Sequence, residues 1–82
     1  GIQKIKSDVK KGNIDVIAFF SSSQAKNLFL LLGEDIKKCQ LFAIGEQTQQ
    51  SILHMGAEVK ATAEISTGKG LAEKIIKVLK NV

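Results

Sequence analysis

The sequence predicts an open α/β fold in which a parallel sheet is flanked by helices. Segments with helical periodicity alternate with strand-like segments along the 82 residues, and this alternation is typical of parallel sheets. Two of the strand-like segments are nearly continuous apolar runs, as expected for strands with helices on both faces. No apolar run approaches the roughly 20 residues that span a bilayer. We therefore expect a soluble domain with no membrane partner.

The first half of the chain predicts a helix, a strand and a second helix. Residues 2–11 carry an apolar stripe of helical period and end at Gly12. Residues 14–20 predict the central strand, buried on both faces, because they are apolar and rich in β-branched and aromatic residues. The second helix follows three serines and stops at Gly33. Four apolar residues share one face of this helix: Ala25, Leu28, Phe29 and Leu32.

The second half predicts two more strands and two more helices. Val59, Ala61 and Ala63 alternate with polar neighbours, so the third strand should be half-exposed and near a sheet edge. The last helix carries an apolar stripe formed by Leu71, Ile75, Val78, Leu79 and Val82. In chain order we expect a polar connection over 34–40, a buried strand over 41–44, a helix over 48–55 closed by Gly56, a strand over 58–63 and a helix over 69–81.

Three turns should meet at one edge of this sheet, because ligands of open parallel sheets bind beyond the carboxyl ends of the strands. We name them the serine turn (residues 21–23), the glycine turn (residues 45–48) and the threonine turn (residues 65–68). Each carries hydroxyls or glycine and precedes a helix, whose first N–H groups have no partner within the helix. The turns are therefore candidate sites for carboxylates or phosphates.

Several other kinds of site are excluded by the residues. A Ser/His hydrolase is improbable because no GxSxG surrounds the serines and His54 lies on a helix away from the strand ends. Residues 66–70 do not match GxxxxGK[ST], so we interpret them as a helix start capped by Thr67. One Cys and one His, without clustered carboxylates, assemble no metal site. We expect neither a metal nor another cofactor.

Charge and cysteine content restrict the partners and the compartment. Twelve basic residues, all lysine, stand against eight acids, and the chain lacks Tyr and Trp. Nucleic-acid readout favours arginine and aromatic stacking, so we expect no nucleic-acid partner and interpret most lysines as solvated helix faces. The single Cys39 excludes an internal disulfide framework and fits a reducing compartment, with the cytoplasm as the default. A monomer is expected.

The order and spacing of these pieces resemble the C-terminal third of uroporphyrinogen-III synthase. That family has a strand followed by Ser-x-Ser, an Ala-Ile-Gly strand end before a threonine, a Gly-x-x-Val strand, Ala-Glu with Ser or Thr close behind, and a Gly/Ala-Leu helix. Here these motifs are Ser21-Ser22-Ser23, Ala43-Ile44-Gly45 with Thr48, Gly56 to Val59, Ala63-Glu64 with Ser66 and Thr67, and Gly70-Leu71. Ser22 stands where proline is common, and Glu46-Gln47 replace Pro and a small residue.

The resemblance implies one incomplete domain of a two-domain enzyme, with residues 1–82 forming a single flavodoxin-like or Rossmann-like α/β domain. Such enzymes have their active site between the domains and convert hydroxymethylbilane, a linear tetrapyrrole octacarboxylate, to uroporphyrinogen III with ring D inverted and water lost. The N-terminal strand and helix of the domain, and a tyrosine near the inter-domain ladder, are missing from this chain, which should be inert alone. The implied substrate-binding residues are Ser21, Ser22, Ser23, the N–H of Gln24, Gly45, Gln47 and Thr48, with Ser66 and Thr67 as weaker candidates; no general acid is assigned.

A second interpretation is a non-catalytic flavodoxin-like or receiver-like domain whose three turns hold a phosphate or a partner. Receivers need an aspartate at a strand end, and none of Asp8, Asp15 and Asp35 is placed there. Flavin binding would favour aromatic residues in the turns, which the sequence does not have. These two observations make the synthase interpretation the stronger one.

Overall fold

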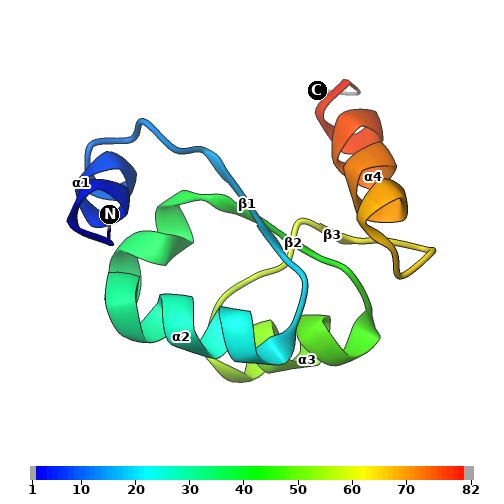
Figure 1. The fold of residues 1–82 in the computed structure, drawn as a ribbon, viewed down its shortest axis with the longest axis horizontal. Coiled ribbons are helices and arrows are strands. Elements are labelled where there is room, and N and C mark those ends of the chain that lie inside the picture. The colour runs from blue at the N-terminus through cyan, green and yellow to red at the C-terminus, as the bar shows by residue number, and fades with distance from the viewer. Residues whose placement is uncertain (1, 81–82) are drawn as a thin grey trace.

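The computed structural model describes residues 2–80, which form helices, short strands and one 3-10 helix (Figure 1). In chain order the elements are α1 (Ile2–Lys10), β1 (Val16–Phe19), α2 (Ser22–Leu32), η1 (Gly33–Lys38, the 3-10 helix), β2 (Gln40–Ala43), α3 (Glu46–His54), β3 (Ala61–Thr62) and α4 (Gly68–Lys80). The alternation of helices and strands confirms the predicted α/β class. The predicted stripe position Val82 and helix end Asn81 lie outside the described residues.

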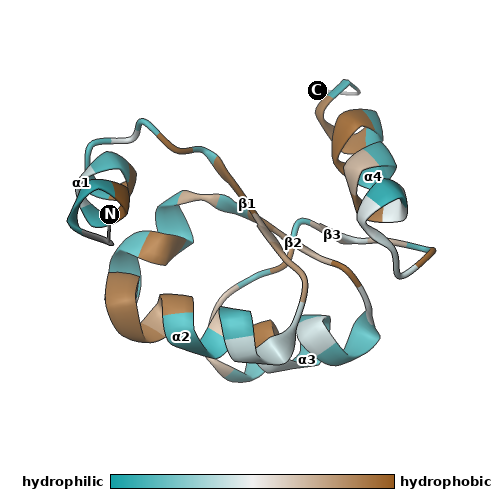
Figure 2. Cartoon of the chain, in the orientation of Figure 1, coloured by the Kyte–Doolittle hydropathy of each residue, from teal (hydrophilic) through white to brown (hydrophobic). Residues whose placement is uncertain are grey.

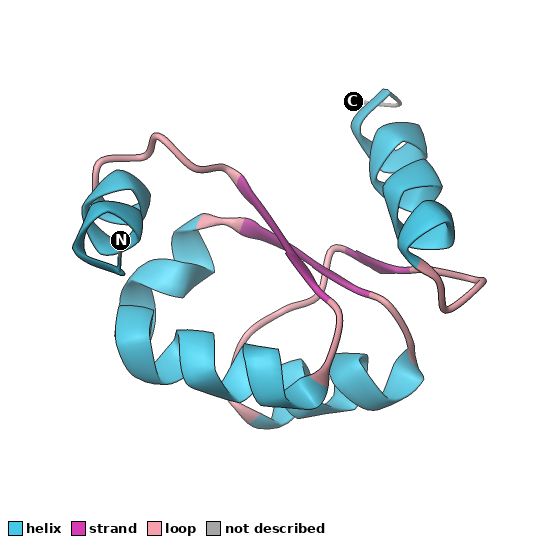
Figure 3. Cartoon of the chain, in the orientation of Figure 1, coloured by secondary structure: helices cyan, strands magenta, loops and turns pink. Residues whose placement is uncertain are grey.

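The three strands form one parallel sheet in the order β1-β2-β3. Val16 pairs with Gln40 and Phe42 pairs with Ala61, so β2 is the central strand (Figure 3). The prediction that residues 14–20 form the central strand is wrong: β1 has a strand partner only on its β2 side within residues 2–80, and only Phe19 in it is fully buried. An apolar run indicates burial of side chains, but it does not indicate which neighbours the strand has.

Helices cover the two faces of the sheet unequally. Among residues 2–80, α2 and α3 lie on one face together with η1, and α4 is the helix on the other face (Figure 1). The first helix packs against η1 and α2 rather than against the middle of the sheet. Gly33 ends α2 in the left-handed region at φ 58°, and its N–H donates to the carbonyl of Phe29, as the sequence predicts.

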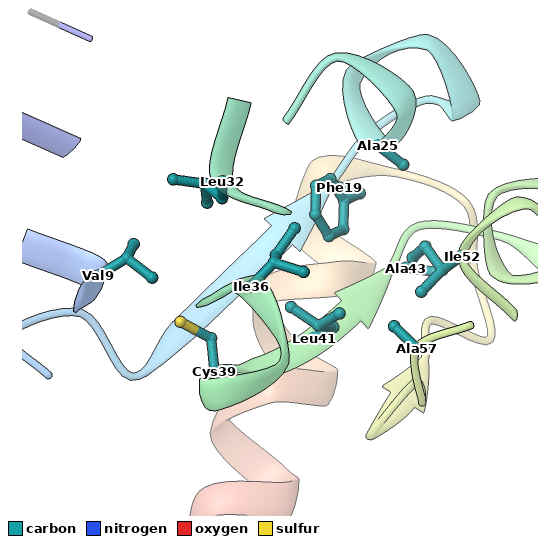
Figure 4. Packing of buried hydrophobic residues seen from close by; sticks show 10 residues of the cluster. All are labelled: Val9, Phe19, Ala25, Leu32, Ile36, Cys39, Leu41, Ala43, Ile52 and Ala57. Carbon is teal, nitrogen blue, oxygen red and sulfur yellow. The ribbon is translucent and has the colours of Figure 1, made fainter. Parts of the chain in front are cut away.

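The larger core cluster lies between the sheet and the α2/α3 layer (Figure 4). Phe19 and Leu41 point from the strands toward Ile36 of η1 and Ile52 of α3, and all four are at most 2% exposed. Full burial of each such side chain contributes about 1.5–3 kcal/mol. In Figure 2 the strands β1 and β2 and the second half of α2 are largely apolar, as this packing requires.

A smaller cluster lies under α4 on the opposite face. Its buried members are Phe42, Ala63 and Leu71. Phe42 belongs to this cluster, and not to the larger one with Leu41, because consecutive residues of β2 point to opposite faces of the sheet. Ile75 and Val78 of α4 also pack against this cluster, whereas Leu79 is 38% exposed, so within the described residues the predicted apolar stripe holds except at Leu79.

Two predicted segments differ from the structure. Residues 34–40, which we expected to be a polar connection, contain most of η1. The charged residues made this segment polar in sequence, although its Ile36 is fully buried. The third strand is only Ala61–Thr62, and Val59 packs in the larger cluster whereas Ala61 and Ala63 pack in the smaller one. The apolar side chains therefore change from one face of the sheet to the other between residues 59 and 61. The alternation of apolar and polar residues over 58–63 predicted a single face and could not indicate this change.

Candidate functional site

The three turns meet in one cleft of about 470 Å³ at the carboxyl ends of the strands. We call it the carboxyl-end cleft. Because β1, β2 and β3 are parallel neighbours, the segments that follow them emerge at the same edge of the sheet. The residues that line the cleft are Phe20, Ser21, Ser22, Ser23, Ile44, Gly45, Glu46, Gln47, Thr48 and Ser66. Gln24 and Thr67 are the predicted site residues that do not line it.

Ser21 is the N-cap of α2. Its hydroxyl oxygen accepts a hydrogen bond from the N–H of Gln24 at 3.1 Å, and the Gln24 side-chain oxygen accepts one from the N–H of Phe20 at 2.8 Å. This reciprocal pattern is close to a capping box, and the Ser-x-x-Gln spacing was available in the sequence as its signal. The Gln24 N–H that we expected to hold a carboxylate is therefore already used within the turn.

Ser22 connects the serine turn to α3. Its hydroxyl accepts a hydrogen bond from the Ser51 hydroxyl at 2.8 Å and donates to the carbonyl of Gln47 at 3.4 Å. Ser23, the third serine, is exposed and lines the cleft. The three adjacent serines thus have three different roles: a cap, a link between helices, and an exposed hydroxyl.

The glycine turn presents the start of α3 to the cleft. Gly45 is the N-cap and has no side chain to occupy the first N–H groups of the helix. Thr48, in the first turn, is 4% exposed and is the buried polar residue of the part of the chain that the structure describes. The N–H groups of residues 46–48 and the Thr48 hydroxyl are therefore donors held on a rigid element.

Gly45 also makes room for the threonine turn. A Cβ atom at this position would lie 2.9 Å from the Ser66 hydroxyl oxygen, closer than real Cβ contacts. The backbone at φ −162° is extended and would suit any residue, and a Cβ atom here would only make the exposed Ser66 hydroxyl turn aside. Thr67 instead caps α4, because its hydroxyl accepts from the Gly70 N–H at 3.0 Å. That cap was predicted, and it directs Thr67 away from the cleft.

The electrostatics of the cleft come from backbone and hydroxyl groups. Glu46 is the one ionisable side chain among its lining residues, and it is exposed. Two helix starts, of α2 and α3, direct the positive ends of their dipoles toward the cleft. Among residues 2–80 no group of three or more His, Cys, Asp or Glu side chains is placed to hold a metal. The arrangement suits an anionic ligand that is held by hydrogen bonds.

Comparison with known proteins identifies the family. Residues 2–73 match the family model described as uroporphyrinogen-III synthase HemD. The chain belongs to the uroporphyrinogen-III synthase family. It is 34% identical over 80 residues to the uroporphyrinogen-III synthase of Chlorobaculum parvum (strain DSM 263 / NCIMB 8327), and the match covers 95% of this chain and 32% of that protein. The family prediction made from the motifs is confirmed.

Solved structures of uroporphyrinogen-III synthase from the thermophilic bacterium Thermus thermophilus show the same fold. One of them, a wild-type crystal structure, has a TM-score of 0.85 at 17% identity and covers 98% of this chain. Another has a TM-score of 0.80 at 21% identity and covers 95%. In both cases the match covers 34% of the solved chain. The chain thus spans about a third of the length of these relatives.

Two features of the site were not predicted from the sequence. Ser51 is half-buried on α3 and reaches the serine turn, although 29 residues separate it from Ser22. Glu46 brings a negative charge to the cleft, and its place in the glycine turn was a signal that could have been used.

In the described part of the chain no helix has the length and apolar character needed to cross a membrane.

Proposed function

We propose that this chain is the C-terminal part of a uroporphyrinogen-III synthase that cyclises hydroxymethylbilane to uroporphyrinogen III. In this reaction the hydroxymethyl C–O bond breaks, the oxygen leaves as water, and a new carbon–carbon bond closes the ring with ring D inverted through a spiro intermediate. The observation that carries the proposal is the family match over residues 2–73. The convergence of the three turns on one cleft supports it.

The chemistry of the cleft suits this substrate. Eight carboxylates need donors, and the cleft supplies helix N–H groups and the hydroxyls of Ser21, Ser23, Thr48 and Ser66. The bilane also closes without an enzyme, to the other isomer, so catalysis depends on holding the chain in the folded shape that favours inverted attack. A site made of fixed hydrogen-bond donors can do this without a strong acid or base.

The carboxyl-end cleft is only part of the site in this proposal. Single pockets of drug-sized ligands occupy about 300–1,000 Å³, and at about 470 Å³ this cleft suits only a portion of a four-ring substrate. The remaining donors would come from the second domain of the intact enzyme. The 82 residues alone should therefore not form the III isomer.

The outer edge of β1 supports the proposal that the domain is incomplete. A groove of about 700 Å³ runs along β1 and α2, and we call it the β1 groove. Leu30 beside it is 86% exposed and Phe20 is 50% exposed, which leaves large apolar side chains without cover. The lining residues are Ile17, Ala18, Phe19, Phe20, Gln24, Asn27, Leu28, Leu30 and Leu31. A further strand and helix of the same domain would cover this groove.

We also propose that the intact enzyme is a monomer, acts in the cytoplasm and has no nucleic-acid partner. The lysine-only basic residues and the absence of Tyr and Trp in the chain support the last point. Light scattering of the full-length protein, with and without added RNA, tests the first and last points. A dimer mass, or a mass that rises with RNA, would contradict them.

The decisive experiment is a cyclisation assay on the full-length parent protein. Hydroxymethylbilane is generated freshly, and the I and III isomers are separated by chromatography after oxidation. Predominant III isomer supports the synthase function. If only the I isomer forms at the spontaneous rate, the function is wrong and a non-catalytic phosphate-binding or partner-binding domain becomes the better interpretation.

A further inference from the structure

A pair of serine hydroxyls joins the two helix starts that face the carboxyl-end cleft. The Ser51 hydroxyl donates to the Ser22 hydroxyl at 2.8 Å, and both residues are half-buried. The Ser22 hydroxyl in turn lies 3.4 Å from the Gln47 carbonyl oxygen, to which it donates. We call this chain of contacts the serine clip.

The serine clip connects the first turn of α2 to the first two turns of α3. Ser22 is the first residue of α2, and Gln47 and Ser51 lie four residues apart and therefore share one face of α3. The two helices pack along each other, as Figure 1 shows. Because each helix carries its free N–H groups within this first turn, the clip fixes the distance between the two sets of donors.

The hydroxyl chemistry of Ser22 assigns it an indirect role. A serine hydroxyl has one hydrogen to donate, and at Ser22 this hydrogen is directed at Gln47. A carboxylate can only accept hydrogen bonds. While the clip holds, Ser22 has no hydrogen for a substrate carboxylate, although it lines the cleft.

We propose that Ser51 is a positioning residue, which acts through Ser22 to hold the N–H groups of the two helix starts at the spacing that two carboxylates of the substrate require. The inference rests on the proposed synthase function and adds a residue outside the cleft lining to it. Ser51 touches no substrate in this proposal. Its effect is on binding and on the choice of isomer, because both depend on how the bilane is folded in the cleft.

The test uses the full-length parent enzyme with Ser51→Ala, Ser51→Thr and the double variant Ser22→Ala/Ser51→Ala. Ser51→Ala should raise KM about fivefold, as expected for one lost hydrogen bond, and should increase the share of the I isomer. Ser51→Thr keeps the hydroxyl and should stay within about twofold of the wild type. The double variant should be no more impaired than Ser51→Ala, because both substitutions remove the same Ser22–Ser51 hydrogen bond and their effects are therefore not additive.

A matched control separates positioning from stability. Ser7 is also a half-buried helical serine, on α1 and outside the cleft lining, so Ser7→Ala removes the same atom elsewhere. It should leave KM and the isomer ratio unchanged. The proposal is overturned if Ser51→Ala has wild-type KM and isomer ratio, or if Ser51→Thr is impaired as strongly as Ser51→Ala.

Hydrogen exchange distinguishes failure of this inference from failure of the proposed function. The amides of Gln24, Ala25 and Gln49 close the first turns of α2 and α3 by hydrogen bonds. They should exchange faster in Ser51→Ala than in the wild type and Ser7→Ala, whether or not the parent cyclises the bilane. Unchanged exchange in an active parent overturns the clip alone. A parent that forms no III isomer overturns the function and, with it, the role of Ser51 toward this substrate, while exchange still decides whether the clip orders the two helix starts.

Discussion

The two ends of the sheet carry clefts of nearly equal size but opposite character. The carboxyl-end cleft, of about 470 Å³, is lined by hydroxyls and helix starts. The amino-end cleft, of about 490 Å³, is lined by Lys37, Cys39, Gln40, Leu41, Gly56, Ala57, Glu58, Val59 and Lys60. Counting charged side chains would place an anion at the amino end, where the lysines are. Backbone polarity places it at the carboxyl end, where two helices begin.

In the proposed function the anion binds at the carboxyl end, so neither cleft volume nor lysine content would locate the site. Lys37 is exposed and already paired with Glu34 at 2.9 Å, and an exposed pair of this kind contributes only about 0.2–1 kcal/mol. The helix α3 ends at the amino-end cleft, so it presents carbonyl oxygens there. Three variants test which end the substrate uses, and the first two are each paired with a control.

Gly45→Val should have the largest effect. The valine side chain would move the Ser66 hydroxyl and occupy part of the cleft that Gly45 lines, and misplacement of a bound group by about 1 Å can cost on the order of 100-fold in rate. The kcat/KM for III-isomer formation is the measurement. Gly56→Ala is the control in the amino-end cleft: at φ 87° it should lose about 1 kcal/mol of stability and keep its activity. Equal activity of the two variants would contradict the comparison.

Thr48→Val should lower turnover more than stability. The change removes a hydroxyl in the carboxyl-end cleft and leaves the buried volume nearly unchanged, so we expect about tenfold lower kcat/KM from one lost donor. Thr62→Val is the matched control, because the Thr62 hydroxyl is buried without a hydrogen-bond partner within residues 2–80 and outside the cleft. It should be neutral or slightly stabilising. A wild-type rate for Thr48→Val in the intact enzyme would count against a role in substrate binding.

Lys37→Gln and Lys60→Gln together should change KM by less than about twofold, because both residues line the amino-end cleft only. The measurement is KM for the bilane at low and at physiological salt. An increase of tenfold or more would move the anion site to the amino end and overturn the assignment.

The smallest expected effect is the slow alkylation of Cys39, which lines the amino-end cleft. Burial and, to a lesser degree, the nearby Asp15 carboxylate raise the pKa of its thiol. The thiol donates to the carbonyl of Ile14 at 3.2 Å, so it should remain protonated at neutral pH and react slowly with iodoacetamide. Because the pKa is raised in the folded state, the protonated thiol contributes to stability below its ordinary pKa. This contribution to the free energy of unfolding is lost as the pH rises through the raised pKa. Peptide mapping after iodoacetamide treatment measures the alkylation of Cys39. Rapid labelling of Cys39 in the native protein at pH 7 would refute the prediction that its thiol stays protonated.

The sequence predicted what local chemistry determines. Gly12 and Gly33 as helix ends, the cap at Thr67, and the meeting of three turns at one edge all follow from backbone rules that act within a few residues. The order of the strands was not available in the same way, because an apolar run is the same at the edge and in the centre of a sheet. Contacts across the fold, such as Ser22 with Ser51, depend on how the helices pack.

The uncovered edge of β1 has a consequence for handling the chain in isolation. Residues 16–20, Val-Ile-Ala-Phe-Phe, carry neither charge nor proline and have high β-propensity. An open strand edge of this composition is a template for strands of other molecules, and such segments promote amyloid-like association. Residues 1–82 expressed alone would therefore self-associate through this edge, and a charged residue in place of Phe20 would act as a gatekeeper against it.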